Sequence, residues 1–191
     1  MEPQVNSVLK SCYFQIRNIG KIRHFIIVDA CKTLVQSLVT SRLDYCNVLM
    51  HGITQTQISR LQRMQNCAAR LVTRTKRREH ITPILYDLHW LPVRYRAQFK
   101  ILMLTFKSLH GLAPDYISNN VNRYVPVRSL RSESKSLLTV PAARTQTYGT
   151  KRFDCAAAIL WNDLPFDARI ETNFNAFKRI VKTTFFRSAF Y

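Results

Sequence analysis

The sequence predicts a mainly all-α protein, and two observations lead to that prediction. Only four glycines occur among the 191 residues, and apolar residues recur mostly every three or four positions. This spacing places apolar side chains along one side of a helix, whereas a half-buried strand would alternate them. The chain is 47% hydrophobic, which favours a folded core over disorder. We therefore expect a helical, bundle-like first region and a C-terminal helical extension, joined by a long irregular segment.

Helix signals follow one another through the first part of the chain. The apolar spacing predicts helices at Val28 to Leu38 and at Arg42 to Met50. Thr54 and Gln57 then fit a capping box, in which the threonine side chain accepts a hydrogen bond from an otherwise unpaired backbone N–H group. We expect a long helix to follow this box and to end at about Val72.

Prolines mark the next helix starts. Proline suits the first turn of a helix because its φ angle is already helical and its missing N–H group would have no partner there. Pro83 and Pro92 each follow a residue that can begin a helix, and the helix begun at Pro92 is predicted to reach His110. A further short helix is expected at Asp115 to Asn119.

The composition divides the chain into three parts. We assign residues 1–125 to the helical first region. Residues 126–150 are rich in Ser, Thr, Arg and Pro without a helical pattern, so we expect an irregular connection with SLLTV as its only strand-like piece. Residues 151–191 form the C-terminal extension, with helices at Phe153 to Leu164 and Asn173 to Phe190, and we expect it to pack on the first region.

The charge balance points to a polyanionic partner. Lys and Arg outnumber Asp and Glu 29 to 11, which gives a formal net charge of +18 and a pI near 10.3. Membrane insertion is not expected, because apolar runs such as Ile101 to Leu104 are too short to cross a bilayer. The first residues also lack a signal-peptide core. We therefore expect an intracellular protein, nuclear or cytoplasmic and not secreted.

Residue patterns typical of catalysis are missing from the sequence. The seven aspartates are dispersed, whereas metal-dependent phosphoryl transfer needs clustered carboxylates. The five cysteines contain no C-x-x-C pair, so we expect neither a zinc site nor disulfides, but reduced and mostly buried thiols, and no cofactor is expected. His80, Asp87 and His89 leave a histidine-dependent nuclease open as one alternative, provided that the two histidines converge.

The candidate nucleic-acid-binding residues lie on the two longest predicted helices and the turn between them. On the first helix, about 100° of rotation per residue places four arginines within an arc of roughly 80°, opposite an apolar face. These are Arg60, Arg63, Arg70 and Arg74, with no acidic residue between Thr54 and Arg78. The turn adds Lys76, Arg77 and Arg78, and the Pro92 helix adds Arg96, Lys100 and Lys107 on one face. Guanidinium groups suit bidentate phosphate contacts.

Several blocks of the sequence together resemble one protein family. They include SRLDYCNVLMHGI, LQRMQNCAARLVT, HITPILYDLHWLPVRYRAQFKILMLTFKSLHGLAPDYI, VPAARTQTYGTKRF and AAAILWNDLP. In this order and spacing they resemble the C-terminal part of reverse transcriptases of non-LTR (LINE-type) retrotransposons of the jockey and chicken-repeat group. In that family the region follows the polymerase palm as the thumb and C-terminal extension, which grip template and primer.

The resemblance implies nucleic-acid binding without catalysis. The family's endonuclease and its Asp-Asp polymerase motif would lie upstream of Met1, so we expect a catalytically incomplete fragment, a truncated element copy or a gene product begun late. Binding to RNA or DNA would then use phosphate contacts with little sequence information. The alternative is a protein-interaction module whose basic helices dock an acidic partner or the missing polymerase domains.

Overall fold

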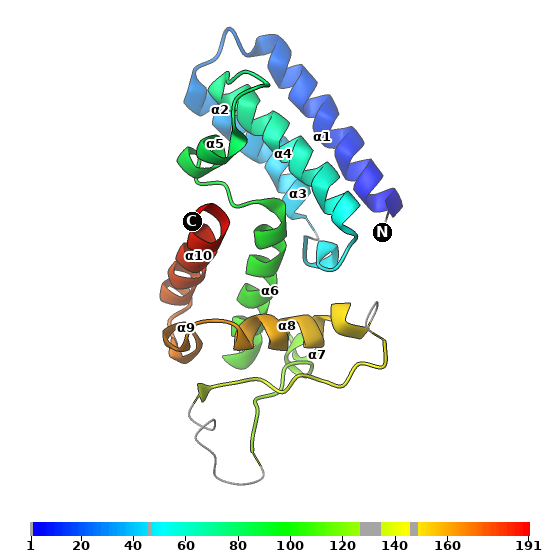
Figure 1. The fold of residues 1–191 in the computed structure, drawn as a ribbon, viewed down its shortest axis with the longest axis vertical. Helices are drawn as coiled ribbons and strands as arrows, with labels where there is room; N and C mark the ends of the chain where they lie inside the picture. Colours follow the sequence, from blue (N-terminus) through cyan, green and yellow to red (C-terminus); the bar gives the residue numbers. More distant parts are fainter. Residues whose placement is uncertain (1, 46, 127–134, 146–148) are drawn as a thin grey trace. The chain divides into compact units, whose positions relative to one another are not determined.

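The computed structural model describes residues 2–45, 47–126, 135–145 and 149–191. The described part is mostly helical, which confirms the prediction of a mainly all-α fold. The chain forms two compact units, shown in Figure 1. Unit 1 consists of Met1–Ala97 with Ala189–Tyr191, and unit 2 consists of Gln98–Ser188. The division falls inside one helix, α6, and not near residue 125, where the composition had placed the first boundary.

Unit 1 is built from helices and short helical turns. They are α1 (Glu2–Ile22), α2 (Val28–Val35), the π-helical segment η1 (Gln36–Thr40), α3 (Ser41–Asp44), the 3-10 turn η2 (Asn47–Met50), α4 (Gln55–Thr73), α5 (Ile81–Asp87) and the beginning of α6 (Val93–Leu109). The predicted long helix after Thr54 is present as α4, and α6 begins directly after Pro92 as expected. Helix α1, with 21 residues, was not predicted.

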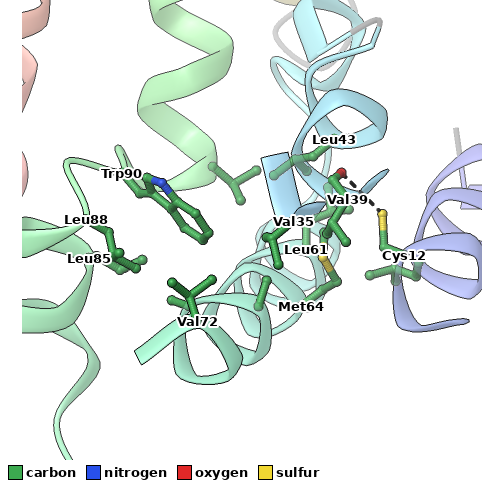
Figure 2. Close-up of a cluster of buried hydrophobic side chains, with 14 of the residues drawn as sticks. Cys12, Val35, Val39, Leu43, Leu61, Met64, Val72, Leu85, Leu88 and Trp90 are labelled. Atoms are coloured by element: carbon green, nitrogen blue, oxygen red, sulfur yellow. Dashed lines mark hydrogen bonds between the residues drawn. The ribbon is translucent and has the colours of Figure 1, made fainter. Parts of the chain in front are cut away.

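The core of unit 1 lies where α1, α2 and α4 pack together. Helix α1 buries Val5, Val8, Leu9, Cys12 and Ile19, at spacings that keep these side chains on one side of the helix. Figure 2 shows Cys12 beside Val39 and Leu61, with Met64, Val72, Leu85 and Trp90 continuing the cluster along α4 and past α5. This continuous apolar cluster holds the helices of unit 1 together.

The predicted helix from Arg42 to Met50 is interrupted. The backbone of Tyr45 is extended, with φ −67° and ψ 121°, so α3 ends at Asp44 and the chain resumes as η2. The prediction of one helix was therefore wrong at this point. An extended residue lets Asn47 turn inward, where it is 7% exposed and its Nδ2 lies 3.4 Å from Asp44 Oδ1.

Two capping residues, one before and one after α4, mark where this helix begins and ends. Thr54 is the N-cap, and its Oγ1 accepts a hydrogen bond from the Gln57 N–H group at 3.4 Å, as the capping-box prediction expected of the threonine. At the other end Arg74 has φ 57°, in the left-handed region that ends a helix. Non-glycine residues are uncommon in this region, and the Arg74 side chain is held by a hydrogen bond to Arg23 O.

Two arginines join the C-terminal ends of α1 and α4. Arg23, just after α1, is only 5% exposed, and it donates to the Leu71 and Val72 carbonyls of α4 at 2.9 and 2.8 Å and to Ile26 O at 2.9 Å. Arg74, just after α4, donates in return to Arg23 O at 2.9 Å. We call this reciprocal pair the arginine clasp. It places positive charge at the negative end of the α4 dipole and satisfies carbonyls that a helix end leaves unpaired.

Unit 2 contains the second half of α6 and the C-terminal helices. They are α7 (Asp115–Ser118), the 3-10 turn η4 (Gly149–Lys151), α8 (Phe153–Asn162), α9 (Phe166–Ile170) and α10 (Phe174–Phe190), of which α9 was not predicted. Three rings form the centre of the core: Phe106 stacks on Phe177 with centroids 4.5 Å apart, and Trp161 stacks on Phe177 at 5.5 Å. On α10 the buried residues are Phe177, Val181 and Phe185, the face predicted from their spacing.

The described part of the predicted irregular connection is attached to α8 by side chains. Asn162 accepts from Leu138 N at 2.8 Å and donates to Leu138 O at 2.9 Å, while Trp161 Nε1 donates to Ser136 O at 2.9 Å. Leu138 also pairs with Arg123 in an isolated antiparallel bridge. Residues 136–145 therefore run beside α8 without helical structure, whereas Gly149 and Thr150 belong to the 3-10 turn η4. Residues 127–134 and 146–148 lie outside the described residues.

Trp161 is expected to be essential for the stability of unit 2. It is 1% exposed and combines ring stacking with a hydrogen bond, so Trp161→Ala should lower the free energy of unfolding by about 3–5 kcal/mol. Ile159→Ala on the same helix is the control, because Ile159 is 47% exposed and its loss should cost only about 0.5 kcal/mol. Denaturant unfolding of both variants measures the difference, and equal losses would contradict the role of Trp161.

The arginine clasp gives a second expected outcome. Arg23→Gln removes hydrogen bonds from a charged group to buried carbonyls, so it should destabilise the protein by about 1.5–3 kcal/mol or more. Arg17→Gln removes the same charge from an exposed position of α1 and should change stability by less than about 0.5 kcal/mol. If thermal and denaturant unfolding place both variants equally close to the parent, the clasp contributes no stability.

The cysteines differ in their expected reactivity. Cys12, Cys31 and Cys155 are buried free thiols, as expected, whereas Cys67 is free but exposed, and Cys46 lies outside the described residues. Burial raises the pKa of the Cys12 thiol to about 11, with Arg42 opposing that shift. At pH 8 the native protein should therefore alkylate at Cys67 and not at Cys12, as read by peptide mass spectrometry. Rapid modification of Cys12 without unfolding would show that its burial is wrong.

Candidate nucleic-acid interface

Of the four arginines predicted as an exposed stripe, Arg60, Arg63 and Arg70 lie on α4 and Arg74 caps its C-terminal end, and they are not equally available. Arg63 is exposed. Arg60 is half-buried and donates to Asn6 Oδ1 of α1 at 2.8 Å and to Gln57 Oε1 at 3.2 Å. The side of α4 that carries the arginines therefore borders α1, so part of its charge is used in helix packing.

The two C-terminal arginines of the predicted stripe bind backbone carbonyls. Arg70 donates to Glu79 O at 3.0 Å, and its buried Nε has no hydrogen-bond partner among the described residues. Arg74 belongs to the arginine clasp through Arg23 O. Each guanidinium retains further N–H donors, but both side chains already have a structural role. Arg63 is exposed and makes no such backbone contact with the described residues.

The cationic turn after α4 is exposed. Lys76, Arg77 and Arg78 all project into solvent. The Lys76 backbone N–H group donates to Glu79 Oε1 at 3.1 Å, so the only nearby carboxylate closes the turn. The structure therefore leaves these three side chains as surface cations, in agreement with the sequence interpretation.

The second predicted row, Arg96, Lys100 and Lys107, is not a single surface. Arg96 forms an ion pair with Asp44 through two hydrogen bonds, and its side chain is only 17% exposed. Lys107 lies over the Phe174 ring, 5.2 Å from its centroid, and Lys100 is exposed in unit 2. Since Arg96 belongs to unit 1 and has an internal partner, the expectation of one phosphate-binding row is not supported by this geometry.

Helix α1 carries a basic surface that the sequence analysis missed. Lys10, Phe14, Arg17 and Lys21 are all exposed, and their spacing of four, three and four residues keeps them within an arc of roughly 60°. Phe14 is 60% exposed and the neighbouring Tyr13 is 41% exposed. The signal was present in the spacing of the cations, but it could be recognised only once residues 2–22 were known to be helical.

The basic side of α1 and that of α4 meet at Tyr13. Burial raises the pKa of the Tyr13 hydroxyl, Cys67 shifts the pKa in the same direction, and Arg63 and Arg60 oppose the shift. These charges act on Tyr13 because they lie close to it. We define the α1–α4 face as Lys10, Tyr13, Phe14, Arg17, Lys21 and Arg63.

Carboxylates are absent from the sequence around this face. No Asp or Glu occurs from Pro3 to Val28, or from Tyr45 to Arg78. The cations of the face therefore have no acidic neighbours on their own helices beyond Glu2, and their positive potential is not neutralised locally. Exposed rings beside unneutralised cations can stack on unpaired bases while the cations contact phosphates.

The histidines considered for a nuclease do not converge. His80 is the N-cap of α5, and His89 follows the end of that helix with φ 56° and its Nδ1 2.9 Å from Tyr86 O. Helix α5 has seven residues, which rise roughly 10 Å, and the two histidines flank it at opposite ends. Within the part of the chain that the structure describes, no three His, Cys, Asp or Glu side chains gather as metal ligands.

The comparisons with known proteins identify no relative of this chain. None of the described helices is both long and apolar enough to cross a bilayer. No family model, curated protein or solved structure matches the chain.

Proposed function

We propose that this chain binds nucleic acid through its phosphate backbone, with the α1–α4 face as the main contact surface. The observation that carries the proposal is the combination of exposed cations and exposed rings on two packed helices that contain no acidic residue beyond Glu2. Phosphate contacts give affinity to any strand and little sequence preference. Tyr13 and Phe14 add stacking, which favours single strands or unpaired ends over continuous duplex.

The proposal extends to the parent protein. The sequence blocks resemble the thumb and C-terminal extension of non-LTR retrotransposon reverse transcriptases, where a basic helical region would grip template and primer. Polymerase chemistry would then belong to other parts of such a protein, because the aspartates here are dispersed along the sequence. The chain would act in that setting as a non-catalytic grip on the nucleic acid.

The contacts of the arginines change which residues should be tested. Replacing Arg60, Arg70 and Arg74 would break contacts within unit 1 as well as any phosphate contact, since each bonds to another part of the chain. A loss of binding in such a variant would not separate folding from recognition. Lys10, Arg17, Lys21 and Arg63 are all exposed and offer a cleaner test.

Changing Lys10, Arg17, Lys21 and Arg63 together to glutamine should weaken binding to single-stranded RNA and DNA without changing helix content. Each lost phosphate contact flattens the plot of log affinity against log salt by about 0.7 to 0.9, so the slope should change by about three. Fluorescence anisotropy at several salt concentrations measures this slope, and circular dichroism checks the fold. The loss should be similar for unrelated sequences.

A matched control lies on α10. Lys178, Arg179, Lys182 and Arg187 are also exposed, and changing them to glutamine removes the same charge from unit 2. The α10 variant should keep most of the affinity. An equal loss in both variants would mean that binding follows net charge and not the α1–α4 face. Parental affinity and slope in the α1–α4 variant would refute the proposal, and preferential binding to heparin over nucleic acid would favour the protein-interaction alternative.

A further inference from the structure

An open pocket lies in unit 1 between α1 and α3, and none of its lining residues belongs to the α1–α4 face. Its volume is about 390 Å³, within the range of roughly 300–1,000 Å³ typical of small-molecule sites. Helix α1 contributes Ser7, Val8 and Ser11 to the pocket. Helix α3 contributes Ser41 and Arg42, and Tyr45 follows directly after α3. The pocket therefore combines one guanidinium, three hydroxyls, one phenol ring and one aliphatic side chain.

The polar side of the pocket suits an anion. Arg42 is exposed and donates to Ser11 Oγ, and it forms no ion pair within the described residues. The nearest carboxylate in sequence, Asp44, is held by Arg96. Arg42 therefore keeps its positive charge and further N–H donors for a ligand. Ser11 accepts from Arg42 and retains its own O–H group as a donor, whereas the Ser41 hydroxyl already donates to Ser37 O. Guanidinium with hydroxyl groups is a typical phosphate-binding combination.

The other side of the pocket suits a flat ring. The extended backbone of Tyr45 takes this residue out of the helix, and its side chain is 70% exposed. An exposed tyrosine offers a face for stacking, and the neighbouring Val8 provides an apolar edge. A ligand that carries both a phosphate and an aromatic ring matches the two sides of the pocket.

We propose that this pocket binds one nucleotide unit, with the phosphate at Arg42 and the serine hydroxyls and the base on Tyr45. The unit is either a free nucleotide or an unpaired nucleotide of a bound strand, and the chemistry of recognition is the same for both. Binding of an unpaired nucleotide rests on the proposed function, because it requires a nucleic-acid strand bound to unit 1. Binding of a free nucleotide does not depend on the proposed function.

Titration of the full chain with adenosine 5′-monophosphate tests the pocket directly. Two-dimensional NMR should show shifts of the Ser7, Ser11, Ser41 and Tyr45 amide signals that saturate together. Adenosine 5′-monophosphate should bind more tightly than inorganic phosphate or adenosine alone. Arg42→Gln should weaken binding at least about tenfold, as expected for a lost charged hydrogen bond. Tyr45→Leu should reduce the affinity roughly tenfold, toward that of phosphate. Both side chains are exposed, so neither change should affect folding.

Controls separate this proposal from the proposed function. Arg17→Gln removes the same charge from α1 outside the pocket and should leave nucleotide binding unchanged. The variant with four substitutions on the α1–α4 face should lose strand binding but still bind adenosine 5′-monophosphate, so failure of one proposal does not imply failure of the other. A duplex with one unpaired nucleotide, compared with a fully paired duplex, identifies the source. A preference for the unpaired nucleotide that Tyr45→Leu abolishes indicates the strand, and binding of the free nucleotide without that preference indicates the free ligand.

The proposal would be overturned if adenosine 5′-monophosphate caused no saturable shifts. It would also be overturned if Arg42→Gln and Arg17→Gln reduced the shifts equally. In the second case the nucleotide would be responding to the general positive charge of the chain.

Discussion

The C-terminal ends of α1 and α4 are joined by arginines, and the arrangement of unit 1 depends on this connection. Arg23 donates to the last carbonyls of α4, and Arg74 donates to the residue that follows α1. These hydrogen bonds are specific in position because each joins one donor to one carbonyl, whereas the hydrophobic effect between the two helices is non-directional. By fixing which turn of α1 lies beside which turn of α4, the clasp also determines which surface residues become neighbours.

The arginines of this chain divide between structure and surface. Arg23, Arg70 and Arg74 use guanidinium groups to satisfy carbonyls, and Arg96 uses one to neutralise Asp44. A formal charge of +18 therefore overstates the charge that is freely available to a partner. Exposed cations lie on α1, at Arg63, in the turn after α4 and on α10. The α1–α4 face differs from α10 because its cations lie beside the exposed rings of Tyr13 and Phe14.

Local signals predicted the local structure well. Thr54 and Pro92 identified helix starts because capping and proline geometry depend on a few neighbouring residues. The face of α10 was predictable from its spacing alone. Helix α1 was missed because exposed Tyr13, Phe14 and Ile22 mix with its buried residues and obscure the apolar period.

The candidate sites depend on contacts between residues far apart in the chain, which the spacing of residues along the sequence cannot predict. Angular position along α4 could not show that Arg60 would bond to Asn6 and Arg74 to Arg23, each about fifty residues earlier in the chain. Arg96 was likewise assigned to a surface row before Asp44 was known as its partner. The pocket joins residues from two separate helices, so no single window of the sequence contained it.

The π-helical segment η1 affects how the protein tolerates the deletion of a residue. A π turn of this kind holds one residue more than an α-helix would need between Val35 and Ser41. Loss of one residue within this segment would restore regular α-helical winding and leave the residues on either side at nearly the same angular positions, so Arg42 and Tyr45 would still face the serines of α1. Loss of one residue from a regular α-helix would instead rotate everything that follows by about 100°. The chain can therefore lose a residue in this segment and keep the pocket.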